Sequence, residues 1–113
     1  MKIRIIIFLF SLSICLFAGC SKKPKGTRGE HEVWLQYKLF VPQQLVVKAG
    51  TTVTFTNKDN ANHSATNAGG LFDSGKLTSD NSYVYTFDKP GTYSFYCIYH
   101  SSNTSEQGFI VVQ

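Results

Sequence analysis

The chain has 113 residues, of which 42% are hydrophobic and 16% charged. This length suits one small domain, and the composition excludes a coiled coil, collagen and an acidic disordered chain. The 11 Lys and Arg against 7 Asp and Glu give a formal net charge of +4. Lys2 and Arg4 lie in a segment that we expect to be removed, which leaves nine basic and seven acidic residues, or +2. Because no basic patch with interleaved aromatic residues is present, nucleic acid is not an expected partner.

The first residues are typical of a signal peptide. Lys2 and Arg4 precede an apolar run over 5–17, which only two serines interrupt. The run is shorter than the roughly 20 residues that a bilayer-spanning helix needs, so it favours the hydrophobic region of a signal peptide. The segment ends in Leu16-Phe17-Ala18-Gly19-Cys20. This ending resembles a bacterial lipobox with Cys20 as the lipidated residue; an ordinary cleaved signal peptide and an uncleaved anchor are the alternatives.

The chain therefore divides into three expected parts. Residues 1–19 form a lipoprotein signal peptide, 20–30 a lipid-anchored basic linker, and 31–113 the folded domain. Residues 21–29 hold four basic residues and no apolar residue suited to a core. They are typical of a flexible tether, whose charges either keep it solvated or favour an anionic lipid surface. We expect the mature protein in the cell envelope, anchored to a membrane by lipid and facing the periplasm or the exterior.

The pattern of the folded part is all β. Short runs with alternating or β-branched residues, bounded by Gly and Pro turns, occur at 32–40, 45–47, 51–57, 83–87, 92–97 and 109–112. A long polar loop covers 58–70. Outside the signal peptide, no run of ten residues has a capped helical period. Many short strands separated by turns predict a β-sandwich or a barrel.

One cysteine requires a functional explanation. Cys15 leaves with the signal peptide and Cys20 is the expected lipidation site, so Cys97 has no disulfide partner in an oxidising compartment. Cys97 and His100 end one predicted strand, and His63 lies in the long polar loop.

This group of residues suits copper. A thiolate favours Cu(I), imidazole accepts Cu(II), and a trigonal set of two His and one Cys suits both oxidation states. Taken alone, Cys97 fits a small buried residue and each His a surface residue, but their joint placement favours a metal site. His31 has no such partners and is expected on the surface.

Five motifs follow one another in a characteristic order over some 80 residues. They are Phe40-x-Pro42, Val47-Lys48-Ala49-Gly50-Thr51-x-Val53-x-Phe55-x-Asn57, Asp59-x-x-x-His63-Ser64, Phe72-Asp73-Ser74-Gly75 and Tyr85-x-Phe87-x-x-Pro90-Gly91-Thr92-Tyr93-x-x-x-Cys97-x-x-His100. In these motifs the chain resembles the small blue copper proteins, or cupredoxins, of plastocyanin-like type. The resemblance implies an all-β Greek-key sandwich with one type 1 copper ion, cycling between Cu(II) and Cu(I), at one end. It also implies that His63, Cys97 and His100 hold the copper.

The resemblance further implies a role in electron transfer rather than in catalysis. His100 would be the imidazole through which electrons pass, and the backbone N–H of Ser64 could bond the Cys97 sulfur and raise the reduction potential. Tyr99 and Phe72 either frame the site or serve only packing. The expected partners are a redox protein of the cell envelope and, through the lipid, the membrane, and the protein is expected to be a monomer.

Two other copper functions remain as alternatives. The first is a copper-binding or delivery protein without redox traffic, although the chain has no Met- or His-rich tract. The second is a non-blue mononuclear copper site with an open position for a small molecule. A hydrolase is disfavoured because no oxyanion loop or third orienting group accompanies Cys97 and His100. A dinuclear copper centre needs a second Cys in this loop.

The fourth copper ligand departs from the family pattern. Met1 is the only methionine, so the mature protein has no thioether to offer. Counting forward from His100 places Asn103 at the usual Met position, whereas counting back from Gly108 places Glu106 there. We prefer the second count because loops tolerate insertions. Gln107 is the next candidate, and a copper without a strong axial ligand is the third possibility. An oxygen ligand predicts a lower potential and a colour shifted from blue toward green or red.

Overall fold

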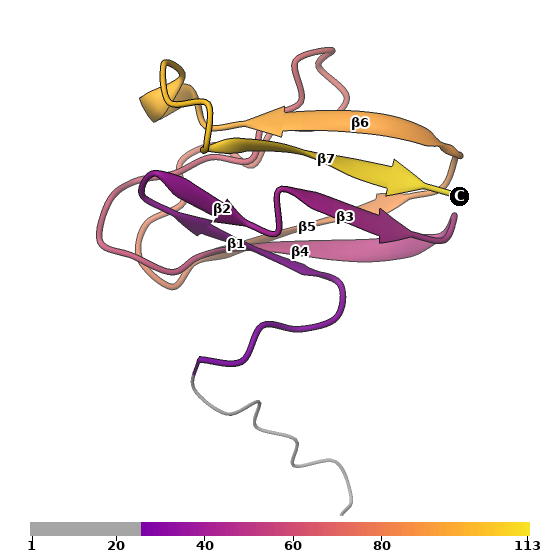
Figure 1. Ribbon diagram of the computed structural model, residues 1–113, viewed down its shortest axis with the longest axis horizontal. Helices are drawn as coiled ribbons and strands as arrows, with labels where there is room; N and C mark the ends of the chain where they lie inside the picture. Colours follow the sequence, from indigo (N-terminus) through magenta and orange to yellow (C-terminus); the bar gives the residue numbers. More distant parts are fainter. Residues whose placement is uncertain (1–25) are drawn as a thin grey trace, which may run out of the picture.

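A computed structural model describes residues 26–113, which form two β-sheets packed face to face (Figure 1). The strands are β1 (Glu32–Gln36), β2 (Leu39–Val41), β3 (Gln44–Val47), β4 (Thr51–Asn57), β5 (Ser82–Phe87), β6 (Gly91–Tyr96) and β7 (Gln107–Val112). One sheet has the order β2-β1-β4-β5 and the other β3-β7-β6. The pairs β1–β4 and β3–β7 are parallel, and the other pairs are antiparallel. The fold is the Greek-key β-sandwich that the sequence predicted, and its one helical element in this part of the chain is the 3-10 turn η1 (Ile98–His100).

The core lies between the two sheets and follows from the alternation along the strands. In β1 Val33 and Leu35 are buried while their neighbours are partly exposed, and β7 buries Ile110 and Val112 in the same way. Aromatic residues fill the centre. The buried apolar residues are Val33, Leu35, Phe40, Val47, Val53, Phe55, Ala65, Phe72, Leu77, Phe87, Phe95, Cys97, Ile110 and Val112.

The predicted run over 32–40 is not one strand but a hairpin, and this prediction was wrong. β1 and β2 pair antiparallel with Gln36 opposite Leu39, so Tyr37 and Lys38 form the turn between them. The sequence offers no Gly or Asn to mark the turn; Lys38 itself adopts the left-handed conformation, with φ 61°. An external contact helps to hold the turn, because the backbone N–H of Tyr37 donates to the Asp59 carboxylate.

The long segment between β4 and β5 is fastened to the end of β6. Thr66 forms bridges with both Asp73 and Tyr96, and the backbone groups of Thr66 and Tyr96 exchange hydrogen bonds of 3.0 and 2.9 Å. Because Tyr96 precedes Cys97, this bridge brings the residues around His63 to the Cys97 end of the strand. The segment after β6 and the β1–β2 turn lie at the same end of the sandwich, away from the C-terminus (Figure 1).

Gly108 lets β7 begin in a crowded position. A Cβ atom there would lie 2.1 Å from the backbone oxygen of Gln43 and 2.7 Å from the ring of Phe95. No side chain fits between these two groups without a backbone shift. The glycine therefore fixes the chain two residues after Glu106.

The predicted signal peptide, the lipidation site Cys20 and the first part of the linker lie outside the described residues. Within residues 26–113, no helix has the length and the apolar character needed to cross a membrane.

Candidate metal centre

Cys97 and His100 are brought together by a single 3-10 turn. Cys97 follows β6 directly, is fully buried, and stands at the N-terminal cap of η1. A 3-10 helix has three residues per turn, so His100 returns to the same side as Cys97. The result is a distance of 3.5 Å between Cys97 Sγ and His100 Nδ1.

His63 reaches the same point from the β4–β5 segment. Its backbone N–H and C=O exchange hydrogen bonds of 3.1 and 2.8 Å with Leu77, which holds the residue in an isolated bridge. The imidazole is fully buried and contacts Phe40 edge-on at a centroid distance of 5.8 Å. Its Nδ1 lies 3.7 Å from Cys97 Sγ.

Glu106 supplies a fourth donor, and the sheet register explains why. The last pair between β6 and β7 is Tyr96 and Gln107, and just beyond it the backbone N–H of Cys97 donates to the Glu106 carbonyl at 3.1 Å. Glu106 is buried and its side chain is fully enclosed, an unusual state for a carboxylate. Its Oε1 lies 2.9 Å from His63 Nδ1 and 3.0 Å from His100 Nδ1.

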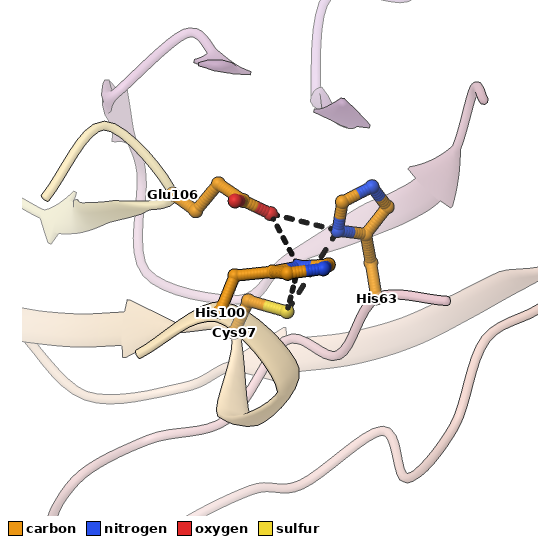
Figure 2. Close-up of side chains that lie close together, drawn as sticks. All are labelled: His63, Cys97, His100 and Glu106. Atoms are coloured by element: carbon orange, nitrogen blue, oxygen red, sulfur yellow. Dashed lines mark hydrogen bonds and ion pairs between the residues drawn. The ribbon is translucent and has the colours of Figure 1, made fainter. Parts of the chain in front are cut away.

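The four donor atoms face one another across a small central space (Figure 2). All lie within 4.8 Å of one another. Despite its two short contacts, Glu106 Oε1 has no hydrogen-bond partner of acceptable geometry among the described residues. A buried carboxylate oxygen without a donor is costly unless a cation neutralises it. A thiolate, two imidazoles and a carboxylate aimed at one point therefore fit a bound metal ion.

The surroundings favour the thiolate that a metal binds. Burial raises the pKa of the Cys97 thiol, but hydrogen bonds from His63, from the backbone N–H groups of Ser64 and Tyr99, and from His100 outweigh burial and lower it to about 7. Burial lowers the pKa of His63, but hydrogen bonds and charge interactions with Cys97 and Asp59 raise it to about 8. A thiol that ionises near neutral pH is prepared for metal binding.

The Nε2 atom of His63, on the side of the ring away from the cluster, contacts a carboxylate. His63 Nε2 lies 3.0 Å from Asp59 Oδ1 and 3.1 Å from Oδ2. Burial raises the pKa of Asp59, but hydrogen bonds with His63 and with the backbone of Tyr37 and Ala61 bring it below the ordinary value. A carboxylate on the outer nitrogen is the usual support of a metal-binding imidazole, and here it leaves Nδ1 to face the metal.

Comparison with known proteins identifies the family. The model of the cupredoxin-like domain family matches residues 8–112. The chain belongs to the cupredoxin family. Its fold and the cluster of His63, Cys97 and His100 fit a single type 1 copper ion.

Solved structures of other cupredoxin folds superpose well. A purple cupredoxin from Nitrosopumilus maritimus matches with a TM-score of 0.65 and 25% identity, covering 73% of this chain and 98% of that one. An amicyanin variant matches with a TM-score of 0.67 and 25% identity, covering 77% and 85%. A copper-containing nitrite reductase from Thermus scotoductus has a TM-score of 0.64 and 29% identity over 73% of this chain, but only 22% of that chain. None of the curated proteins matches the chain.

The other predicted residues of this cupredoxin occupy varied positions. Gln107, the first residue of β7, is exposed, whereas the preceding Glu106 is buried. Phe72 packs in the core against Phe55 and Phe87, whereas Tyr99 is 44% exposed. The side chain of His31 is 46% exposed, as expected.

Ser64 supports the site with both its backbone and its side chain. Its backbone N–H donates to the Cys97 sulfur, and its hydroxyl accepts a 3.0 Å hydrogen bond from the N–H of Ile98. The contact of Asp59 with His63 was not predicted from the sequence, although a carboxylate four residues before a candidate His ligand was a visible signal.

His100 is the cluster residue that reaches the surface of the cupredoxin. Its side chain is 25% exposed, whereas those of His63 and Glu106 are fully enclosed. A shallow hollow beside it is lined by Tyr37, Lys38, Tyr99, His100, Ser102 and Asn103. Access to the buried cluster is therefore shortest through the imidazole of His100.

Proposed function

We propose that the protein is a lipid-anchored electron-transfer cupredoxin of the cell envelope, and not an enzyme. In this proposal His63, Cys97 and His100 bind one type 1 copper ion, with Glu106 as the axial ligand. The observation that carries it is the convergence of four donor atoms within 4.8 Å, one of them a buried carboxylate oxygen without a hydrogen-bond donor. The bound copper supplies a one-electron couple between Cu(II) and Cu(I).

Fixed ligands support electron transfer because they limit the geometric change between the two oxidation states. Cys97 is held between β6 and η1, and its backbone is bonded to Glu106. His63 is held from both sides, by its bridge to Leu77 and by Asp59. The folded chain thus holds these donor atoms in place, and Cys97 and His63 are each held by more than one contact.

His100 is the proposed route for the electron. It is the only one of the four cluster residues with a substantially exposed side chain. The side chains around it include Tyr37, at 54% exposure, and Tyr99, at 44%. A surface of this kind, with exposed aromatic rings and the charged Lys38 beside them, suits a brief encounter with a redox partner protein.

Glu106 is preferred over Gln107 as the axial ligand because of the register. Side chains alternate along a strand, so Glu106 shares the inner side with Cys97 while Gln107 is directed outward. An anionic oxygen stabilises Cu(II) over Cu(I), which predicts a low reduction potential and a colour shifted away from blue. One of the superposed structures is described as a purple cupredoxin, so that protein has a colour other than blue.

A small-molecule site on the copper is less well supported. An open coordination position would have to face solvent or a cavity, but the fourth donor of the cluster is a buried carboxylate. A copper-delivery role predicts transfer of copper to a partner without a reversible redox couple. The enclosed positions of His63, Cys97 and Glu106 argue against rapid exchange of the ion.

Membrane attachment through Cys20 completes the proposal. The basic linker over 20–30 would connect the lipid to the sandwich, whose first strand begins at Glu32. Arg28 donates a 2.7 Å hydrogen bond to the backbone oxygen of Glu32, so the described end of the linker is fastened to the domain. The remaining linker would let the His100 surface approach a partner at the same membrane.

Voltammetry of the copper-loaded protein tests the redox role. The proposal predicts one reversible one-electron wave and retention of copper in the presence of a moderate chelator. An irreversible wave, together with rapid loss of copper to the chelator, would favour delivery over electron transfer.

A further inference from the structure

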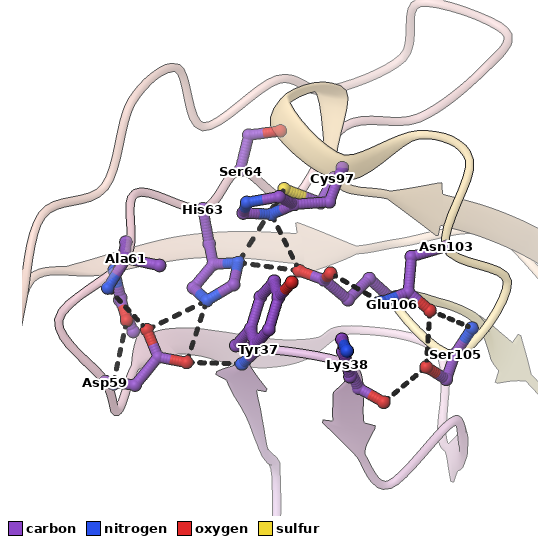
Figure 3. A network of polar contacts seen from close by, with 12 residues as sticks. Tyr37, Lys38, Asp59, Ala61, His63, Ser64, Cys97, Asn103, Ser105 and Glu106 are labelled. Atoms are coloured by element: carbon purple, nitrogen blue, oxygen red, sulfur yellow. Dashed lines mark hydrogen bonds and ion pairs between the residues drawn. The ribbon is translucent and has the colours of Figure 1, made fainter.

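His63 and Glu106 lie outside regular strands, yet both are buried and their donor atoms face the same central space. His63 sits in the long β4–β5 segment, and Glu106 is the residue before β7. A ligand in a loop needs contacts that fix its side chain, because the loop alone leaves it several rotamers. The contacts around these two residues form a continuous polar network (Figure 3).

Asp59 holds His63 with both of its carboxylate oxygens. Oδ1 lies 3.0 Å from His63 Nε2 and accepts a 2.8 Å hydrogen bond from the N–H of Ala61. Oδ2 lies 3.1 Å from the same Nε2 and accepts a hydrogen bond from the N–H of Tyr37. Because both oxygens accept from backbone N–H groups, an amide at this position cannot replace the carboxylate without losing one acceptor.

Asn103 holds Glu106 from the other side. Its Nδ2 donates to Glu106 Oε2 at 3.1 Å, which leaves Oε1 directed at the two imidazoles. Its Oδ1 lies 2.7 Å from the hydroxyl of Ser105 and 3.3 Å from the backbone nitrogen of Ser105. Ser105 in turn contacts the backbone oxygen of Lys38 through its hydroxyl and accepts a 3.0 Å hydrogen bond from the N–H of Phe40.

Both sets of contacts end at the β1–β2 turn. Asp59 connects His63 to Tyr37, and Asn103 with Ser105 connects Glu106 to Lys38. The Tyr37 ring also contacts His100 edge-on, at a centroid distance of 5.4 Å. The turn thus contacts one ligand residue directly and the supports of two others.

We propose that Asp59 and Asn103 are positioning residues of the metal centre, which fix His63 and Glu106 by tying both side chains to the β1–β2 turn. The inference rests on the proposed function, since it assigns the two residues their role through the copper ligands. Neither residue contacts the central space itself. Their effect is to make the donor arrangement largely independent of whether metal is bound.

The test compares Asp59→Asn with Asp88→Asn. Both variants remove one negative charge, but Asp88 is exposed and follows β5 outside the network. Copper affinity is measured by competition with a chelator, and the loss expected for Asp59→Asn is about 10- to 100-fold, the usual effect of removing a support of a metal ligand. Asp88→Asn should retain the affinity of the wild type.

A spectroscopic readout separates positioning from general stability. In the diamagnetic Cu(I) protein, the wild type should show a slowly exchanging His63 Nε2 proton by NMR. Asp59→Asn should shift this proton or exchange it much faster, and Asp59→Glu, which keeps two acceptor oxygens, should restore part of the protection. The Asp88→Asn spectrum should match the wild type.

Asn103→Ala tests the second support and remains informative if Asp59→Asn does not fold. The variant removes the hydrogen bond that the half-buried Asn103 donates to Glu106 Oε2. Ser101→Ala is the control, because Ser101 lies in the same loop and is exposed. The expected result is broadened visible and EPR signals of the Cu(II) protein in Asn103→Ala alone, because Glu106 then adopts more than one orientation.

The outcomes distinguish this inference from the function on which it rests. A wild type that binds no copper would overturn the proposed function. A wild type that binds copper with strong visible absorption, and folded variants that match their controls in affinity, proton exchange and line width, would overturn the positioning roles alone.

Discussion

Cys97 and Glu106 face each other one position beyond the last residue pair of the β6–β7 ladder. The N–H of Cys97 donates to the carbonyl of Glu106 at 3.1 Å, and the preceding pair is Tyr96 with Gln107. The register therefore places the carboxylate of Glu106 beside the sulfur, however long the loop between His100 and β7 is. The position of the fourth donor is a property of the sheet.

Replacing Glu106 by Met should raise the reduction potential and move the colour toward blue. The substitution removes a buried negative charge and supplies a thioether, which residues 26–113 lack. At an effective dielectric constant of about 20, loss of a unit charge roughly 4 Å away corresponds to an increase on the order of 100 mV. Voltammetry and visible spectra measure both effects.

Gln107→Met is the matched control for this substitution. Gln107 is exposed whereas Glu106 is buried, so potential and spectrum should stay close to those of the wild type. If Gln107→Met has the larger effect, the axial assignment is off by one residue. If neither variant changes the potential, the copper has no axial ligand from this segment.

His63→Ala and His100→Gly should differ in their consequences. Both remove an imidazole from the cluster, so each should weaken copper binding by more than the about 10- to 100-fold cost of losing a supporting residue. His100 is 25% exposed, and its removal should also slow electron exchange with partners. Titration with a chelator and stopped-flow kinetics with added imidazole measure the two effects. Equal exchange rates in His100→Gly and the wild type would contradict the assigned route.

Gly108→Ala should destabilise the domain by about 1–3 kcal/mol or more, the range typical of overpacking. The new Cβ would lie 2.1 Å from the Gln43 carbonyl oxygen, which belongs to the backbone and cannot rotate away. Gly69→Ala is the control, because the nearest atom to its Cβ is the side-chain oxygen of Asn67 at 3.1 Å. Urea unfolding measures both variants, and equal losses of stability would show that the close approach is not limiting.

Cys20→Ala should release the protein from the membrane. The prediction follows from the lipobox-like sequence and is independent of the copper site. In cells fed a fatty-acid analogue, the wild type should become labelled and sediment with membranes, whereas Cys20→Ala should do neither. Equal release of both proteins into the soluble fraction would contradict lipidation at Cys20.

The fold was predictable because the hydrophobic pattern, the turns and the ordered motifs agree with one another. The strands over 51–57 and 83–87 differ from β4 and β5 by at most one residue at either end. The β1–β2 hairpin was missed because its turn residues, Tyr37 and Lys38, have no turn propensity of their own. The turn depends on Asp59, 22 residues later, and a contact of that kind leaves no local pattern.

The candidate site was likewise predicted where the sequence carries a local pattern and missed where remote contacts decide. Cys97 and His100 are linked by spacing, and His63 by its motif, so these residues could be proposed together. Counting back from Gly108 already favoured Glu106 over Gln107, and the structure adds a physical reason for this preference, because Glu106 is buried and Gln107 is exposed. The supporting contacts of Asp59 and Asn103 join segments that are remote in the chain, and only the structure reveals them.

The central claim is that Cys97 is the sulfur ligand of a type 1 copper ion, and the visible and EPR spectra of the Cu(II)-loaded protein test it most directly. Within residues 26–113 Cys97 is the one cysteine and no methionine is present, so the folded domain offers no other sulfur in its place. The account predicts intense sulfur-to-copper absorption in the wild type and its complete loss in a folded Cys97→Ala variant. A colourless wild type with an ordinary tetragonal copper signal, or full colour in Cys97→Ala, would contradict it.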